Sequence, residues 1–230
     1  MNRIITKGIV LSRTDYAEAD RIVTMLTPDH GKLRLMARGV RKIKSKLAGG
    51  IELFSVSDIT YMEGRGEIGT LISCRLETHF GKIVKDIDRV QLGYELTKLL
   101  NKATEDHTEA EYFDLMEQAL EALNDSTINL DLIRAWFNAR LLKLAGHSPN
   151  LKTDAAGAEL AAAAKYNFDF EDVAFVPHPD GRLTADHIKI LRLLFSGHSL
   201  QKINRVSGLQ ALITDCSSLI LNMVRTHLRT

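Results

Sequence analysis

The 230-residue sequence predicts an α+β protein, with a five-stranded β-barrel at the N-terminus followed by an all-helical C-terminal domain. Over residues 1–80, apolar residues form short β-branched runs or alternate with polar ones, which is typical of strands. Glycine-containing turns separate these runs. From about Lys82 onward the apolar residues recur at helical spacing. We therefore expect one domain at residues 1–80 and a second at 81–230, with an irregular insert at about 150–183.

The first domain contains five strand-like segments. Pro28-Asp29-His30-Gly31 is a turn in which Gly31 can adopt a positive φ, and Glu63-Gly64-Arg65-Gly66 is a second, hairpin-forming turn. Residues 43–49 are expected to form a loop or one short helical turn. Five strands with a short irregular segment between the third and fourth are typical of a small barrel of the OB type. The predicted strands are Ile4–Leu11, Arg21–Thr27, Lys32–Ala37, Leu53–Met62 and Ile68–Phe80.

Three helices are predicted in the first part of the second domain. An amphipathic stretch extends from Lys82 to Leu100. Thr108 and Glu111 form a T-x-x-E capping box, which predicts a helix that continues to about Leu123. The third helix is expected over Leu130–Ala145, because Gly146 and Pro149 follow it and end helices.

The remainder of the chain mixes short elements with two further helices. The alanine-rich segment Ala155–Ala164 is predicted as a short helix, and Val173–Pro179 as a strand followed by an Asp180-Gly181 turn. Thr184 can cap a helix that ends near Gly197. A last helix is expected from about Leu209 to Leu228.

The composition indicates a protein of the cytoplasm. No segment approaches the roughly 20 apolar residues that a membrane-spanning helix needs, and the first residues lack the pattern of a secretory signal. Cys74 and Cys216 are far apart and offer neither a disulfide framework nor a zinc-ligand spacing. A reducing compartment, the cytoplasm with its nucleoid, is therefore expected.

Positive charge is concentrated near the N-terminus, although the whole chain has a formal net charge of only +1. Residues 1–80 contain 13 Lys and Arg against 9 Asp and Glu, a net charge of +4, and residues 81–230 have a net charge of −3. The window from His30 to Gly50 contains seven cations and no acidic residue. Such a cluster is typical of a surface that follows a phosphate backbone.

These seven cations are the candidate nucleic-acid-binding residues. Period-2 alternation places Lys32 and Arg34 on one face of their strand, opposite Leu33 and Leu35, so that both basic side chains are expected on the open face of a half-buried hairpin. The others belong to the end of the strand and the following loop. A solvated loop that charge merely keeps soluble is the alternative interpretation. The candidates are Lys32, Arg34, Arg38, Arg41, Lys42, Lys44 and Lys46.

Several ordered motifs resemble the RecO family of recombination proteins. KGIVL at 7–11 and DYAEADRIVTMLT at 15–27 resemble the opening of that family, and HGKLRLMARGVRKIKSKLAG at 30–49 resembles its HGK…ARG-x-R-x-x-x-S-x-L signature. The pattern continues through Glu52-Leu53-Phe54. In the second half, Phe113, Leu123 and FNARLL at 137–142, followed by Gly146 and Pro149, resemble its helical domain, where Asn138 stands in place of the usual Glu.

The resemblance implies a fold, a role and partners. It implies an N-terminal OB domain that binds single- and double-stranded DNA, and a helical domain that binds proteins. It further implies strand annealing, binding to RecR and to the acidic C-terminal tail of single-stranded-DNA-binding protein, and thereby indirect help in loading RecA. Many members of the family carry a four-cysteine zinc module after the G-x-x-P segment. Residues 150–182 contain no cysteine here, so no structural zinc and no other cofactor are expected.

A protein-binding groove is a separate hypothesis, which rests on local sequence rather than on matched family positions. An acidic tail with a hydrophobic end would need an apolar pocket beside basic side chains. Trp136, Phe137, Leu141 and Leu142 could supply the apolar part, although an ordinary helix core is the favoured explanation of these four residues. The candidate partner-binding residues are Arg134, Phe137, Arg140 and Lys143.

The sequence contains no convincing catalytic constellation, so a non-enzymatic protein is expected. Asp15, Glu18 and Asp20 with Arg21 are interpreted as a charged turn with local ion pairs, and Asp86 and Asp88 do not share a helix face. His178 and His187 lack neighbouring cysteines and make an improbable metal site. The competing functions are an RNA-binding OB protein, a metal-dependent nuclease and a pure interaction adaptor.

Overall fold

The computed structural model describes residues 3–64, 66–106 and 109–228 of the chain. The chain forms two compact units, Met1–Asp125 and Ser126–Thr230, each with its own core. The change from strands to helices occurs near residue 80, as the sequence predicts, and the first unit also contains the two helices that follow the strands. Arg65 and Thr108, which belong to a predicted turn and a predicted helix cap, lie outside the described residues.

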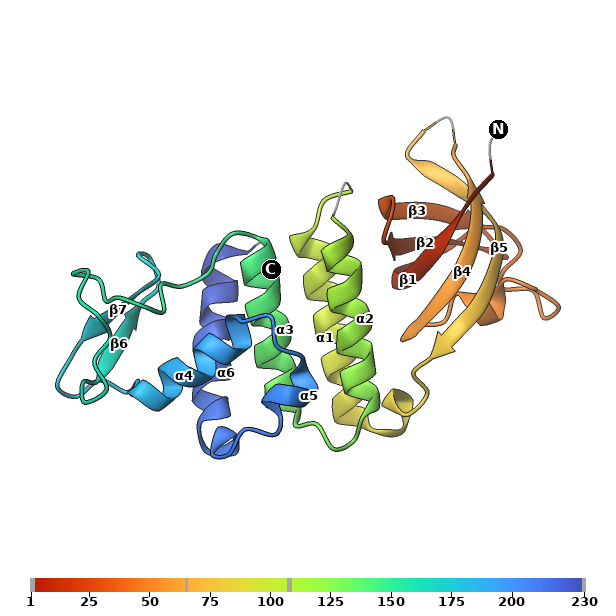
Figure 1. Cartoon of the computed structure of the whole chain (residues 1–230). Coiled ribbons are helices and arrows are strands. Elements are labelled where there is room, and N and C mark those ends of the chain that lie inside the picture. Colours follow the sequence, from red (N-terminus) through yellow and green to blue (C-terminus); the bar gives the residue numbers. More distant parts are fainter. Residues whose placement is uncertain (1–2, 65, 107–108, 229–230) are drawn as a thin grey trace. The chain divides into compact units, whose positions relative to one another are not determined.

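The first unit contains a closed five-stranded barrel, which confirms the predicted OB-type fold (Figure 1). The strands are joined in the order β1-β2-β3-β5-β4, and β1 closes the ring by pairing with β4. All neighbours are antiparallel except β3 and β5, which pair in parallel from Arg34–Ile68 to Met36–Thr70. The strands are β1 Arg3–Tyr16, β2 Asp20–Thr27, β3 Gly31–Ala37, β4 Ser55–Met62 and β5 Ile68–His79.

Alternation along the strands builds the barrel core. The side chains that point inward are nearly inaccessible to solvent, and they come from every strand. Gly31 begins β3 with φ +61°, as the turn at Pro28–Gly31 requires. The segment between β3 and β4 is a loop that contains the 3₁₀ turn Ala48–Gly50. The core cluster includes Val10, Val23, Met25, Leu35, Ile59, Tyr61 and Leu71.

Two helices complete the first unit, α1 (Ile87–Ala103) and α2 (Ala110–Asn124). Asp86 caps α1 by accepting hydrogen bonds from the backbone N–H groups of Asp88 and Arg89. The α2 helix begins with Glu109 at its cap position, one residue later than the predicted capping box requires. The buried Arg89 ties the two helices together, because its Nη1 donates to the Leu123 carbonyl at the end of α2, 3.0 Å away.

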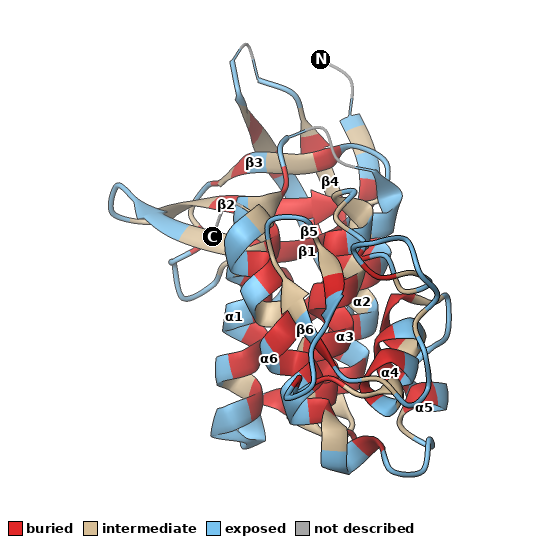
Figure 2. Cartoon of the chain, turned by 90° about the vertical axis from the view of Figure 1, so that its left-hand side faces the viewer, coloured by how far each residue is buried: buried red, intermediate tan, exposed pale blue. Residues whose placement is uncertain are grey.

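The second unit is built on α3 (Leu130–Leu144), α4 (Ala185–Phe195) and α6 (Leu209–His227), which pack against one another, with the single turn α5 (Leu200–Ile203) between α4 and α6. In Figure 2 the buried positions follow the inner faces of these helices. Gly146, with φ +83°, ends α3 where the sequence predicts. Thr184 caps α4 in a capping box that His187 completes.

The insert before α4 matches the sequence prediction only in part: a strand is present within the predicted Val173–Pro179, but other elements differ. It contains a two-stranded hairpin, β6 (Tyr166–Asp169) with β7 (Ala174–Pro177), so the C-terminal region is not helical throughout. The predicted helix at Ala155–Ala164 is wrong. The Asp154 carboxylate instead accepts hydrogen bonds from the N–H groups of Ala156 and Ala158, and Gly157 has φ +83°. A side chain that binds nearby backbone in this way competes with helix formation.

Candidate nucleic-acid interface

The most basic part of the surface is the loop at residues 38–46, called the basic loop below. Both of its ends are fixed to the barrel. Val40 is 4% exposed and lies in the barrel core, and Leu47 packs against the same core. The Gly39 N–H donates to Asp20 Oδ1 at 2.7 Å, and the Arg41 N–H donates to the Ala19 carbonyl at 2.9 Å. The loop is therefore held in place by the β1–β2 turn.

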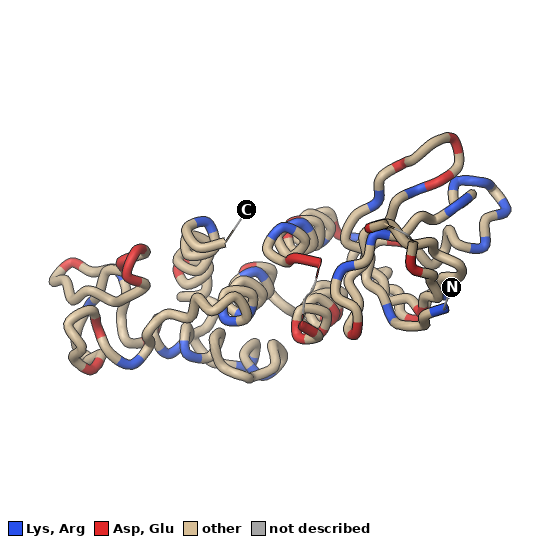
Figure 3. The backbone as a smooth tube through the Cα atoms, turned by 90° about the horizontal axis from the view of Figure 1, so that it is seen from above, with Lys and Arg blue, Asp and Glu red and all other residues tan. Residues whose placement is uncertain are grey.

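Five of the seven predicted cations come together on the basic loop and are exposed. Figure 3 shows Lys and Arg following one another along a loop that protrudes from the barrel. Arg41 lies 3.6 Å from Asp15 in an exposed ion pair. Among the residues that the structure describes, the other four have no ion-pair partner. These four are Arg38, Lys42, Lys44 and Lys46.

The remaining two predicted cations have other partners. Lys32 does not lie on an open face: its Nζ donates to the carbonyls of Asn101 and Thr104 at 3.0 and 2.6 Å, at the C-terminal end of α1. Burial lowers the pKa of the Lys32 ammonium, and the charge interacts favourably with the helix dipole. The interpretation of Lys32 as a direct DNA contact is therefore corrected. Arg34 is exposed but lies 3.4 Å from Glu67.

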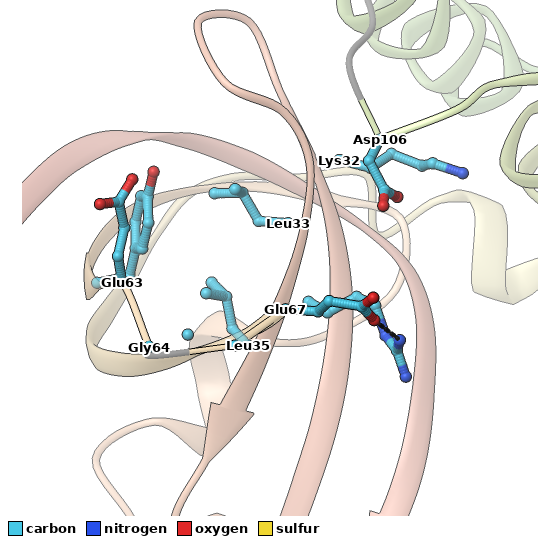
Figure 4. Close-up of a pocket in the computed structure, with 11 residues that line it drawn as sticks. Lys32, Leu33, Leu35, Glu63, Gly64, Glu67 and Asp106 are labelled. Atoms are coloured by element: carbon cyan, nitrogen blue, oxygen red, sulfur yellow. Dashed lines mark hydrogen bonds and ion pairs between the residues drawn. The ribbon is translucent and has the colours of Figure 1, made fainter.

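Next to these two side chains is a shallow pocket of about 190 Å³ (Figure 4). Its lining includes Glu63, Glu67 and Asp106 together with Lys32 and Arg34. Because carboxylates outnumber cations there, the pocket would repel a phosphate rather than attract it. Of these two features, the basic loop and not the pocket therefore offers a phosphate a favourable electrostatic surface.

The acidic group around the β1–β2 turn has a structural role. Asp15 forms a 2.6 Å ion pair with Arg21 as well as the longer one with Arg41. The Arg21 guanidinium, which donates a hydrogen bond to Asp15, lowers the pKa of that carboxyl. Together with Asp20, which accepts from Gly39, these contacts support the interpretation of a charged turn with local ion pairs.

The apolar surface of the barrel provides few platforms for bases. Phe54 and Phe80 are 4% and 5% exposed and belong to the core, as expected, and Tyr61 is also buried. Tyr16, the last residue of β1 before the turn that anchors the basic loop, is 53% exposed. Sequence reasoning overlooked Ile43 at the centre of the basic loop, whose relative exposure is 104%. Its position between four cations in the sequence was the available signal.

The four apolar side chains of the predicted protein-binding groove are 0–1% exposed and belong to the helix core, which leaves only its basic residues to consider. These four apolar residues are Trp136, Phe137, Leu141 and Leu142. Phe137 is 0% exposed, so it is a core residue and cannot contact a partner on the surface. Arg134 pairs with Asp131 at 3.1 Å, and Lys143 donates to the Phe195 carbonyl at 3.2 Å. The Arg140 guanidinium lies 5.9 Å from the centre of the Trp136 ring, and partial burial lowers its pKa. Arg140 is thus the remaining basic candidate of this group.

The described residues contain no group of three or more His, Cys, Asp or Glu side chains that could hold a metal ion. Asp86 is the helix cap described above, and His187 belongs to the capping box of α4. Both cysteines are free and buried, and burial raises the pKa of the Cys74 thiol to about 11 and that of Cys216 to about 12. Neither is therefore an activated nucleophile. No helix in the described part of the chain is long and apolar enough to cross a membrane.

Comparison with known proteins matches both parts of the chain to one family. Residues 1–80 match the family model "Recombination protein O N terminal", and residues 84–230 match "Recombination protein O C terminal".

Named relatives agree with these matches. The chain is 29% identical to the "DNA repair protein RecO" of Halalkalibacterium halodurans over 87% of its length, 33% identical to that of Desulfatibacillum aliphaticivorans over 66%, and 30% identical to that of Dehalococcoides mccartyi over 80%. The matched regions cover 80%, 60% and 72% of those proteins. With both family models matched in order over nearly the whole chain, the protein belongs to the RecO family of DNA repair proteins.

Proposed function

We propose that the protein acts in DNA repair as a recombination mediator that binds DNA through the basic loop. The observation that carries the proposal is the set of five exposed cations on a loop anchored at both ends. Lys and Arg neutralise phosphates and release counterions, a process that requires dense positive charge but little exact geometry. Anchoring by Val40, Leu47 and the Asp20–Gly39 hydrogen bond reduces the entropy that the loop would lose on binding.

The finer parts of the proposal rest on family membership. The protein would bind single- and double-stranded DNA and anneal complementary strands, because two strands repel each other less when cationic surfaces neutralise both. It would also bind RecR and the acidic C-terminal tail of single-stranded-DNA-binding protein, and so help RecA to load. No covalent step is part of this function, so the proposal describes a DNA- and protein-binding protein and not an enzyme.

The experiment measures binding of fluorescent single-stranded DNA across a salt series. The wild type is compared with Arg41→Glu/Lys42→Glu/Lys44→Glu. If these three side chains each contact a phosphate, the slope of log affinity against log salt should become shallower by about 2, at roughly 0.7 per contact on a single strand. The matched control is Lys85→Glu/Lys98→Glu/Lys102→Glu, which changes the net charge by the same amount at exposed positions around and along α1.

Comparing the two variants shows whether the basic loop or the overall charge of the protein governs DNA binding. If the control variant loses as much slope as the loop variant, the net charge of the protein governs binding and the loop has no special role. If the wild type fails to bind DNA at low salt, the proposal is wrong and an interaction adaptor becomes the best interpretation. Binding RNA of the same sequence more tightly than DNA would favour the RNA-binding alternative.

The protein-binding part is tested separately at Arg140. An acidic tail peptide requires a cation, and Arg140 is partly exposed, with its buried Nε unpaired among the described residues. Trp136 beneath it is 1% exposed and belongs to the core. Arg140→Glu should weaken binding of a fluorescent tail peptide, with Lys189→Glu, an exposed cation on α4, as the control. Unchanged peptide affinity in Arg140→Glu would remove this site from the proposal.

A further inference from the structure

The basic loop presents one large aliphatic side chain directly to solvent. Ile43 is 104% exposed, the highest value among the large hydrophobic residues of the described chain. The next apolar residues on either side, Val40 and Leu47, are turned into the barrel core. Helical spacing would place all three on one face, but the segment between Val40 and Leu47 forms turns rather than a helix. Ile43 is thereby excluded from the core that its neighbours enter.

Local hydrogen bonds hold this outward arrangement. The Lys42 N–H donates to the Gly39 carbonyl at 3.1 Å, and the Ser45 N–H donates to the Lys42 carbonyl at 2.9 Å. Two consecutive turns, 39–42 and 42–45, therefore share Lys42, and Ile43 is the first central residue of the second turn. Gly39, with φ +63°, begins the first turn. The side chain sits in an ordered turn and is exposed by the path of the backbone.

We propose that Ile43 contacts the face of an unstacked base, so that the basic loop distinguishes single-stranded DNA from duplex. This inference rests on the proposed DNA binding by the same loop. The cations would hold the phosphates, and the aliphatic side chain would cover the apolar face of a base that has left its stack. Aliphatic side chains such as Ile, Leu and Met contact base faces when they are inserted as wedges into a kinked duplex, at the cost of unstacking a base step. A base that has already left its stack offers the same face without that cost.

The chemistry around Ile43 specifies the partner. Four cations lie within three residues of it in the sequence, Arg41, Lys42, Lys44 and Lys46, and no acidic residue lies between His30 and Gly50. The surface that covers Ile43 must therefore combine negative charge with an apolar patch a few ångströms away. A single strand offers both, because its bases are free to turn outward. A continuous duplex offers only the charge, since its base faces are stacked on one another.

The test compares Ile43→Ser with the wild type on three ligands of equal length: a single-stranded oligonucleotide, the same strand with abasic sites throughout, and a closed hairpin duplex. Because the lost contact is apolar, Ile43→Ser should weaken binding to the normal strand about three- to tenfold at every salt concentration, with an unchanged salt slope. Its binding to the abasic strand and the duplex should equal that of the wild type. Ile5→Ser is the matched control, since Ile5 is 76% exposed on β1.

The outcomes separate this inference from the proposed function. If Ile43→Ser binds all three ligands like the wild type while the triple charge variant loses affinity, phosphate binding stands and the base contact is wrong. Equal losses on normal and abasic strands would also overturn it, because the side chain would then act without bases. Weakened binding of Ile43→Ser to anionic lipid vesicles, with DNA binding unchanged, would assign the side chain to a membrane instead. Failure of the wild type to bind DNA would overturn the proposed function itself.

Discussion

At the scale of single residues, Gly50 shows how closely the barrel core is packed below the basic loop. A methyl group added at Gly50 would lie 2.6 Å from both the carbonyl oxygen and the Sγ of Cys74. We expect Gly50→Ala to lower the free energy of unfolding by about 1–3 kcal/mol, the usual cost of overpacking. Urea denaturation measures this, and Gly49→Ala, whose added methyl would meet nothing within 4 Å, is the control. Equal stability of the two variants would contradict the packing described here.

Glu117 on α2 gives a pH-dependent prediction. Burial raises the pKa of its carboxyl, and the nearby Glu121 raises it further, against the opposing effect of Lys7. The folded-state pKa therefore exceeds the unfolded one, so the stability associated with protonation is present at low pH and is lost as the pH rises through the folded-state value. Glu117→Gln should accordingly stabilise the protein at pH 7 by up to about 1 kcal/mol, because a partly exposed charge is screened.

The control for Glu117 is the same measurement at pH 4. There the native carboxyl is largely protonated and resembles the amide, so the two proteins should unfold at nearly equal urea concentrations. A destabilising effect of Glu117→Gln at pH 7 would show that the carboxylate makes a favourable interaction in the folded state, contrary to the raised pKa.

The environment of a single residue could be predicted from the sequence when its partners are close in the chain, and not when they are far away in the chain. Gly31 in the turn and Phe54 and Phe80 in the core were predicted correctly, because local pattern determines them. The role of Lys32 was missed because its acceptors, the carbonyls of Asn101 and Thr104, are about 70 positions away in the chain. Ile43 was missed because exposure of an apolar residue is a property of the loop path rather than of the residue type.

At the scale of elements, the β6–β7 hairpin is stabilised by aromatic packing. Phe175 is 0% exposed and packs edge-to-face on Tyr166 and Phe168, with ring centres 6.1 and 5.1 Å apart. We expect Phe175→Ala to destabilise the second unit by about 3–5 kcal/mol. Val176→Ala is the control, because Val176 is the next residue on the same strand and is 38% exposed. Urea unfolding monitored by tryptophan fluorescence reports on this unit, which contains Trp136.

The hairpin also allows a test of the expected absence of zinc. Its strands are closed by backbone pairing and by the aromatic contacts, so a chelator should leave the unfolding curves of the wild type and of Val176→Ala unchanged. A shift of the midpoint on adding EDTA would reveal a metal that contributes folding free energy.

The elements that the sequence predicted well are those in which the spacing of the apolar residues fits only a strand or only a helix. The five strands were found within a few residues, although β1 continues five residues beyond the predicted Leu11 as it pairs with β2. The α3 and α6 helices match their predicted ranges because apolar spacing and end signals agree. The alanine-rich segment failed because high helix propensity is a weak preference, and the Asp154 side chain and Gly157 favour a turn there.

At the scale of the whole molecule, the division by net charge, near residue 80, differs from the division into compact units, which falls at Asp125. The seven predicted cations and the anchors of the basic loop lie within the first compact unit, which continues to Asp125 and so includes α1 and α2. Lys32 links β3 to the end of α1, and Arg89 links α1 to α2, so these helices are structural partners of the barrel. Sequence period located the change from strands to helices but could not show which core the first two helices join.

This division predicts that residues 1–125 contain the complete electrostatic DNA-binding surface. A polypeptide of residues 1–125 should fold, as judged by circular dichroism and a cooperative urea transition, because the unit has its own core. Its binding to single-stranded DNA should then show the same salt slope as the full chain, since the number of phosphates neutralised is unchanged. The triple Glu variant made in this fragment should lose the same slope as in the full chain. If the folded fragment binds with a much shallower slope, cations of residues 126–230 also contact phosphates, and the interface extends beyond the barrel loop.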